Sequence, residues 1–191
     1  MSSDMSEDQA ITRAGVEQAV SAMAAQDETT LVLCTGGGTE TGARKMMPKL
    51  PDACFVEVGG FTDAALGKAA EHGVKQVIFV GRAGELAELG SPKDGTGLLG
   101  AITTDMTGSA ELAAEVVAAD TAQRAYELWE AAGVLGPCGR ELCRRVGLQL
   151  EQSAAEGAGP AGGESAPVAA QVVLVDSTGE RMVAMAGRLA R

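Results

Sequence analysis

Three consecutive glycines follow a short apolar run in the stretch TTLVLCTGGGTETGARK, residues 29–45. Each glycine loses much backbone entropy on folding, so three together indicate that the backbone must come close to something. A helix that starts just after them would point free N–H groups and its positive dipole end at the same place. The motif therefore predicts either a ligand cradle or a mere tight turn at Gly36, Gly37 and Gly38, and taken alone it does not decide between them.

The spacing of these glycines departs from the familiar nucleotide-binding motifs. The pattern Gly36-x-Gly38-x-x-x-Gly42 misses the dinucleotide fingerprint because Thr41 occupies its last position, and the GK[ST] of a P-loop is absent. An acid nevertheless follows at a suitable distance, since Glu57 lies 21 residues after Gly36, near the end of a second apolar run. Nucleotide-binding α/β folds place there a carboxylate that accepts hydrogen bonds from ribose. An ordinary outward-facing strand residue explains Glu57 equally well.

Basic side chains offer contacts for an anionic substrate. Arg82, in VGRAG, follows the third apolar run, where a guanidinium suits an anion, although an exposed loop arginine is the commoner case. Arg44, Lys45 and Lys49 form the densest basic patch of the first half, close to the glycines, or the solvated face of a helix. His72, the single histidine, is predicted at a helix end without a catalytic role.

The cysteines suggest no chemistry of their own. They form no CxxC pair and have one histidine in the whole chain as an imidazole partner, so neither a zinc site nor a disulfide framework is predicted. Free cysteine is among the most buried residue types. We therefore expect small buried thiols at all four positions, Cys34, Cys54, Cys138 and Cys143.

The elements that must position these residues alternate along the first 90 residues. Strands are predicted over 29–34, 53–58 and 75–80. Helices are predicted before and between them, over 12–25, 40–47 and 62–73. This alternation is typical of an α/β fold, a Rossmann-like parallel sheet with crossover helices. Ligands of such sheets bind beyond the carboxyl ends of the strands, where the three glycines lie.

The second half is predicted to add helices and a hairpin. Residues 90–108 are rich in Gly, Ser and Thr and are expected to be a flexible loop. Helical periodicity follows over 109–132 and 138–154. Two apolar runs around DSTG, within 168–187, indicate a β-hairpin.

The domain organisation follows from composition. Residues 1–11 are predicted to be a disordered polar tail, and 12–191 a single α/β domain. Within that domain, Gly, Ala, Pro and Ser dominate 155–167, which reads as a second flexible segment.

Charge and hydropathy exclude some partners. The net charge of −11 opposes binding to nucleic acid or anionic membranes, which need a surface of Lys and Arg. The chain has no apolar run near the roughly 20 residues of a membrane span, and its first ten residues do not read as a signal peptide. We expect a cytoplasmic protein without nucleic-acid or membrane partners.

One block of the chain resembles a known family. The block runs from LVLCTGGGTETGARK through LPDACFVEVGG and FTDAALGKAAEHGV to VIFVGRAGELAEL. It is similar to the C-terminal half of the CbiD family, the cobalt-precorrin-5B C-methyltransferases of anaerobic cobalamin biosynthesis. ADTAQRAYELWEAAG and VVLVDSTGE also look like C-terminal segments of that family, so the resemblance covers most of residues 14–186.

The resemblance implies methyl transfer from S-adenosylmethionine to a corrinoid-ring precursor. Such a transfer needs alignment of the reacting atoms and exclusion of water more than covalent help, so catalytic residues stay unassigned and no metal site is expected. A polycarboxylate substrate would contact Arg82, Arg44 and Lys45. The implied cofactor contacts are Thr35, Gly36, Gly37, Gly38, Glu40, Glu57 and Gly59.

The length leaves the function open between three alternatives. CbiD proteins are about twice as long, so the chain either works with a partner chain that supplies the N-terminal half, or it is a catalytically silent relative. A silent relative would bind S-adenosylmethionine, another nucleotide or a corrinoid precursor. The third alternative is a structural or partner-binding remnant in which the glycines only turn a corner.

Overall fold

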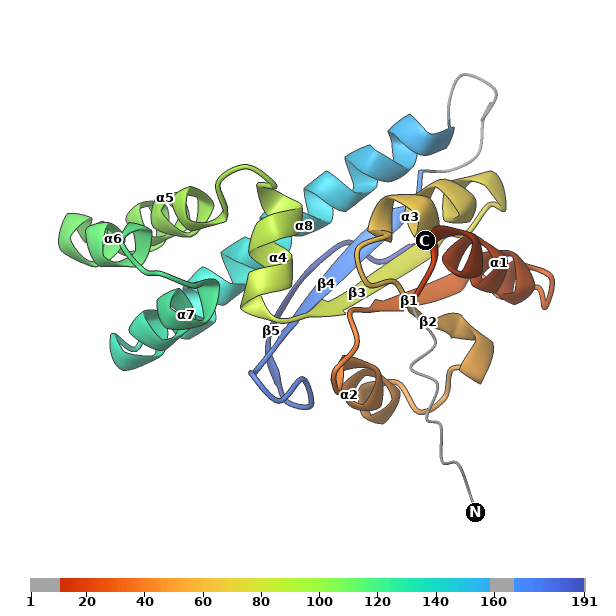
Figure 1. Ribbon diagram of the computed structural model, residues 1–191, viewed down its shortest axis with the longest axis horizontal. Coiled ribbons are helices and arrows are strands. Elements are labelled where there is room, and N and C mark those ends of the chain that lie inside the picture. The colour runs from red at the N-terminus through yellow and green to blue at the C-terminus, as the bar shows by residue number, and fades with distance from the viewer. Residues whose placement is uncertain (1–10, 159–166, 191) are drawn as a thin grey trace, which may run out of the picture.

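A computed structural model describes residues 11–158 and 167–190 (Figure 1). Its centre is a five-stranded sheet in the order β2-β1-β3-β4-β5. The first four strands are parallel, and the last pairs antiparallel with β4. The predicted α/β class with a C-terminal hairpin is therefore confirmed. The strands are β1 (Thr30–Cys34), β2 (Phe55–Glu57), β3 (Gln76–Gly81), β4 (Ala169–Val175) and β5 (Met182–Gly187).

Helices connect and cover these strands. They are α1 (Arg13–Ala24), α2 (Thr39–Met46), α3 (Thr62–Glu71), α4 (Ala83–Gly90), α5 (Gly95–Thr107), α6 (Ala110–Val117), α7 (Ala122–Ala131) and α8 (Leu135–Ala158), with a short 3₁₀ turn, η1 (Asp52–Cys54). The six elements predicted before residue 82 are all present, with ends shifted by at most two residues. Of the described helices, none is both long and apolar enough to cross a membrane.

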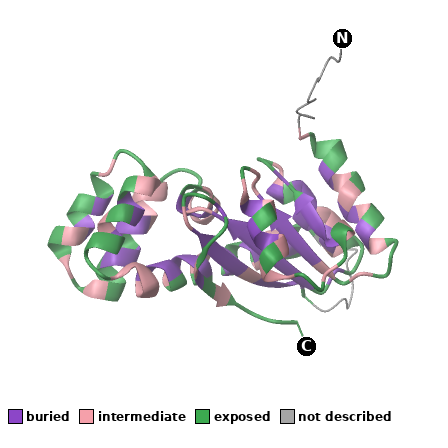
Figure 2. Ribbon diagram, turned by 90° about the horizontal axis from the view of Figure 1, so that it is seen from below, coloured by how far each residue is buried: buried purple, intermediate pink, exposed green. Residues whose placement is uncertain are grey.

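The three central strands β1, β3 and β4 are mostly buried because helices cover the sheet, whereas the edge strand β5 is largely exposed or half-buried. All six residues of β3 are buried, as expected of a parallel strand in the middle of a sheet. The long helix α8 packs on β4 and β5, and an added Cβ at Gly139 would lie 3.1 Å from side-chain atoms of Leu174 and Ala184. Figure 2 shows the buried strands between the more exposed helices.

The helices α5, α6 and α7 form a lobe beside the sheet, inserted between β3 and β4 (Figure 1). Trp129 of α7 is fully buried in this lobe, and its indole N–H donates to the Thr103 hydroxyl of α5 at 2.8 Å. The same hydroxyl donates to the Leu99 carbonyl oxygen at 2.7 Å. The lobe therefore has a polar link at its centre in which every group is satisfied.

The prediction of a flexible loop over 90–108 is wrong, because α5 occupies most of that segment. Asp94 caps the helix by accepting from the Gly97 N–H at 2.9 Å. Its glycines are used for packing, since an added Cβ at Gly100 would overlap the Val117 side chain of α6. Tertiary contacts thus override the low helix propensity of this glycine-rich stretch.

Two other boundaries also differ from the sequence prediction. The helical stretch over 109–132 is two helices, and the second begins at its N-cap Thr121, which accepts from the Arg124 N–H at 3.1 Å. Residues 155–158, expected in a flexible segment, continue α8. Of the remaining predicted flexible residues, 1–10 and 159–166 lie outside the described residues. Ile11, placed in the N-terminal tail, packs against the core.

Candidate functional site

The loops that follow the parallel strands meet at one edge of the sheet. β1 pairs with β2 on one side and β3 on the other, so the chain leaves β1 outward to β2 and later crosses back to β3. The loops after β1 and β3 therefore diverge at this point. In open α/β sheets such a switch point, at the carboxyl ends of the strands, is where ligands bind.

The glycine loop after β1 has a conformation that glycine alone adopts easily. Gly36, Gly37 and Gly38 have φ values of 97°, 57° and 97°. The fully buried Thr39 fixes the loop, because its hydroxyl oxygen accepts from the backbone N–H of Thr35 at 3.1 Å and of Gly36 at 2.9 Å. The loop is thus held rigidly at the start of α2.

The turn of the β4–β5 hairpin, residues 176–181, comes close to this loop. An added Cβ at Gly38 would lie 2.6 Å from the Thr178 carbonyl oxygen. A Cβ at Gly42 would overlap the carbonyl oxygen of Gly179. The close approach that the glycines indicate in the sequence is therefore made, at these two positions, by another part of the chain.

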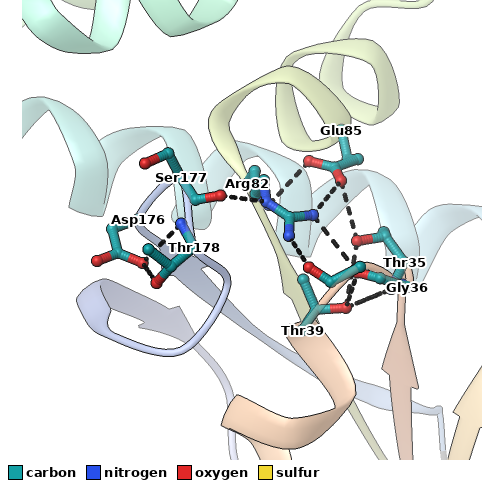
Figure 3. A network of polar contacts seen from close by, with 9 residues as sticks. Thr35, Gly36, Thr39, Arg82, Glu85, Asp176, Ser177 and Thr178 are labelled. Atoms are coloured by element: carbon teal, nitrogen blue, oxygen red, sulfur yellow. Dashed lines mark hydrogen bonds and ion pairs between the residues drawn. The ribbon is translucent and has the colours of Figure 1, made fainter.

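Arg82 joins three loops at this edge (Figure 3). Its guanidinium donates to the carbonyl oxygens of Gly36 at 3.4 Å, of Gly37, and of Ser177 in the hairpin turn at 3.0 Å. The residue predicted to bind substrate thus lies against the glycine loop. Several of its five N–H donors already have protein partners, which makes it a clamp between the loops after β1, β3 and β4.

Glu85 supports this clamp and was not singled out from the sequence. Its two carboxylate oxygens accept from the Arg82 backbone N–H at 2.9 Å and from the Thr35 hydroxyl at 3.0 Å. It also accepts from the Arg82 guanidinium at 3.3 Å. The sequence did contain a signal for it. Glu85 stands three residues after Arg82, the position from which a glutamate side chain accepts from the N-cap backbone N–H at the start of a helix.

A pocket of about 300 Å³ opens beside this network, and we call it the carboxyl-edge pocket. It lies between the end of β1, the start of α3, and the helices α4 and α8. Two of the predicted cofactor contacts line it, Thr35 and Gly59. The other lining residues are Gly60, Thr62, Asp63, Leu66, Phe79, Glu85, Glu88, Leu89, Pro92, Gln149, Leu150 and Ser153.

The lining of the carboxyl-edge pocket is acidic at its polar positions. It contains three carboxylates, Asp63, Glu85 and Glu88, and neither lysine nor arginine. Leu66 and Phe79 supply apolar surface. Arg82 pairs with Glu85 and Arg13 with Asp63, which leaves Glu88 as the lining carboxylate without an ion pair to any described residue. The pocket therefore favours a ligand with an apolar part and a positive charge near Glu88, and it disfavours a polycarboxylate.

Glu57 lies on the other flank of the glycine loop. Its carboxylate approaches Gly36, where an added Cβ would be 3.0 Å from its Oε1 atom. The residue is exposed at the end of β2. The structure therefore brings Glu57 and the glycine loop together, as their spacing suggested, but Glu57 is not among the residues that line the carboxyl-edge pocket.

The remaining predicted contacts are paired with one another or with neighbouring acids. Arg44 donates to the Glu40 carboxylate at 3.0 and 2.9 Å and to Asp52 at 2.6 Å. Its guanidinium also lies 4.7 Å from the ring centre of Phe55. Lys45 forms an ion pair with Glu180 at 3.7 Å. The basic patch of α2 thus neutralises nearby acids, and none of its members lines the carboxyl-edge pocket.

The thiols and the histidine occupy structural positions. All four cysteines are free and buried, which confirms the sequence prediction. Burial raises the pKa of Cys34 and of Cys143 to about 12, which makes them poor nucleophiles at neutral pH. His72 caps the end of α3, and its Nε2 atom lies 3.0 Å from the Ser21 hydroxyl.

Comparison with known proteins finds similarity in both halves of the chain. Residues 96–185 match the model of the CbiD C-terminal domain. This stretch is thus similar to the C-terminal domain of CbiD proteins. It includes α5 to α8 and the β4–β5 hairpin, and so contributes the α8 wall of the carboxyl-edge pocket and the turn that meets the glycine loop.

Curated relatives extend the similarity into the first half of the chain. A cobalt-precorrin-5B C(1)-methyltransferase of Salinispora arenicola is 50% identical over 188 residues, 94% of this chain and 47% of the relative. The protein of that name in Salinispora tropica is 50% identical over 185 residues, 92% of this chain and 46% of the relative. The protein of that name in Rubrobacter xylanophilus is 45% identical over 150 residues, which are 74% of this chain and 38% of the relative.

These findings confirm the resemblance to the C-terminal half of CbiD proteins. The chain spans about half the length of the first two of these relatives. No solved structure matches it significantly.

Proposed function

We propose that the chain is the C-terminal part of a methyltransferase that acts on a cobalt-precorrin, with S-adenosylmethionine as the methyl donor. The observation that carries the proposal is the 50% identity to two proteins named cobalt-precorrin-5B C(1)-methyltransferase. Since the chain spans about half of those proteins, we propose further that turnover needs a partner chain corresponding to their other half.

The carboxyl-edge pocket has side chains that fit such a methyl donor. S-adenosylmethionine carries a sulfonium and an ammonium group, and the exposed Glu88 carboxylate suits either positive charge. Glu85 and Asp63 are already paired with Arg82 and Arg13, so they add negative charge to the lining without being free partners. The backbone at the start of α3, at Thr62, suits its carboxylate, because N–H groups are free at a helix N-terminus. Leu66 and Phe79 would border its apolar parts.

The residues of the site would act by binding and orientation. When bound, the cofactor supplies a methyl group on a sulfonium, and the protein must align the acceptor carbon and exclude water. Arg82 and Glu85 serve that task indirectly, because they hold the loops after β1 and β3 in a fixed relation. Thr35 takes part in the same network from the pocket side.

The charge of the pocket gives a sharp binding test. S-adenosylhomocysteine lacks the sulfonium charge, so we expect titration calorimetry to show tighter binding of S-adenosylmethionine. Glu88→Gln should weaken S-adenosylmethionine about tenfold and reduce that preference. Glu115→Gln, an exposed change on α6, is the matched control and should have no effect. Equal binding of the two ligands by the parent and by Glu88→Gln would contradict this placement.

Glu57→Gln tests the other flank of the glycine loop. The residue spacing suggested that the Glu57 carboxylate holds a ribose, and loss of that contact should weaken binding by about 1–3 kcal/mol. A loss with Glu57→Gln and none with Glu88→Gln would move the cofactor from the carboxyl-edge pocket to the Gly36 side.

The second candidate function is a binding module without turnover. It is favoured by the same observation that calls for a partner, the coverage of only 47% of the relative. Methyl transfer to a cobalt-precorrin, assayed with the chain alone and with the other half of a relative added, separates the two. Cofactor binding without turnover in either sample would establish the silent module.

A further inference from the structure

The segment that leads into α1 lies at the rim of the carboxyl-edge pocket. Ile11 packs on the loop after β2, where an added Cβ at Gly59 would be 3.3 Å from its Cδ1 atom. Two residues later, the Arg13 guanidinium pairs with the Asp63 carboxylate at 3.0 Å. Gly59 and Asp63 both line the pocket, so Ile11 and Arg13 lie at its rim.

Polypeptide that precedes this point in the relatives joins at the same rim. The matching family model is a C-terminal domain, and the relatives are about twice as long as the part that matches. Their additional polypeptide therefore lies mainly before the matched half. A tethered domain has a high effective concentration near its point of attachment, which here is the side of the pocket.

The rim of the pocket is open to solvent and carries exposed acidic side chains. An added side chain at Gly60 would meet no atom within 4 Å, so the loop after β2 borders open space. The Asp63 side chain is 67% exposed, and Glu88 is exposed across the pocket opening. Arg13 already pairs with Asp63, whereas Glu88 forms no ion pair with any residue that the structure describes. A basic surface on the partner would complement them.

We propose that the carboxyl-edge pocket is one half of a composite site. Polypeptide corresponding to the N-terminal half of the CbiD relatives docks on its rim, with basic side chains toward Asp63 and Glu88, and forms the missing wall. This inference rests on one part of the proposed function, the need for a partner chain that corresponds to the other half of the relatives. The acidic pocket suits a cationic cofactor, so contacts to an anionic precursor ring would come from the basic side chains of the partner.

A second groove provides a competing position for the partner. It measures about 700 Å³, has mainly apolar lining that includes Met46, Met47 and Leu189, and has Lys49 and Lys75 among its residues. It also includes Thr30 and Gln76 at the amino ends of β1 and β3, so it lies at the opposite edge of the sheet. The segment that leads into α1 is not among its lining residues, and its two lysines would select an acidic partner.

The test uses the N-terminal part of the Salinispora arenicola relative, expressed as a separate chain and titrated into the purified protein. We expect binding that Asp63→Lys and Glu88→Lys each weaken at least about tenfold. Lys49→Glu, in the competing groove, should change the dissociation constant less than about twofold. Hydrogen exchange of the complex should show new protection in residues 59–63 and 88–92.

The outcomes separate the inference from the proposed function. No binding of the partner, or binding that Lys49→Glu removes and Asp63→Lys leaves intact, overturns the composite site. S-adenosylmethionine binding, measured on the same samples with and without the partner, tests the proposed function independently. Docking at the rim without cofactor binding would uphold the composite site and overturn the assignment of its cofactor.

Discussion

At the scale of single residues, the glycines of the first half have different tasks. Gly36 and Gly37 supply backbone with positive φ, and their carbonyl oxygens accept from Arg82. Gly38 and Gly42 give the hairpin turn space to approach. The fold itself therefore requires most of this motif, and the ligand argument is stronger for the acidic pocket beside it.

Alanine substitution distinguishes a glycine that is needed for packing from one that is not. Gly42 lies inside α2, where alanine normally stabilises a helix by about 0.5–1 kcal/mol. Here the added methyl group would overlap the Gly179 carbonyl, so we expect Gly42→Ala to lower the free energy of unfolding by about 1–3 kcal/mol. Gly67→Ala in α3, which would meet no atom within 4 Å, should raise it by about 0.5–1 kcal/mol. Urea unfolding measures both, and equal effects of the two would refute this contact.

Local spacing in the sequence predicted which residues lie close together around the glycine loop, but not the contacts that come from distant parts of the chain. The 21-residue spacing and the end of the second strand suggested a shared site for Glu57 and Gly36, and the structure brings the two together. The role of Arg82 as a clamp was missed, because its partner Ser177 is 95 residues away and the sequence has no signal for that contact. For the same reason, the α8 wall of the pocket could not be foreseen.

At the scale of elements, helix–strand alternation was read correctly where apolar periodicity is strong. The failure was α5, whose sequence GTGLLGAITTDMT has three glycines and no charged residue in its first turns. Its stability comes from Leu99 and Ile102, which are fully buried, and from the close packing of Gly100 on α6. Contacts of this kind are formed only after neighbouring helices are in place, so a local pattern cannot reveal them.

An acid on α8 links the elements of the lobe electrostatically. Glu141 accepts from Arg144 at 2.6 Å and from Arg145 at 2.9 Å, while Arg145 also donates to Asp105 of α5 at 2.6 Å. The hydrogen bond from Arg144 is the main cause that lowers the pKa of Glu141 from 4.5 to about 2. A lowered pKa in the folded state means that the carboxylate stabilises the protein above about pH 4.5 and loses this effect as pH falls toward 2.

Glu141→Gln should therefore lower the free energy of unfolding in a pH-dependent way. We expect a loss of about 1–2 kcal/mol at pH 7 that shrinks between pH 4.5 and pH 2, in urea unfolding curves of both proteins. Glu127→Gln is the control, because its pair with Arg124 has the same spacing but is exposed, and should cost less than about 0.5 kcal/mol. A constant difference between parent and Glu141→Gln at all pH values would show that its charge is not the cause.

At the scale of the whole molecule, the sheet and the helical lobe are joined through two helices. α4 packs on β3, α7 and α8, while α8 spans from the lobe to β4 and β5. Because α8 carries side chains of both parts, unfolding of the lobe would expose the core of the sheet. We therefore expect one cooperative transition rather than two.

Thr103→Val tests whether the sheet and the lobe unfold together, because it changes the surroundings of Trp129, the single tryptophan of the chain. Trp129 would lose the acceptor of its indole N–H in a fully buried place, which should lower the free energy of unfolding by about 1–3 kcal/mol. Thr103→Ser keeps the hydroxyl and should cost less. Tryptophan fluorescence reports the lobe, whereas far-UV circular dichroism reports all helices and strands, so the two urea curves should coincide and shift together in Thr103→Val. A fluorescence transition that precedes the dichroism transition would mean that the lobe unfolds on its own, and that the α8 wall of the pocket can loosen without loss of the sheet.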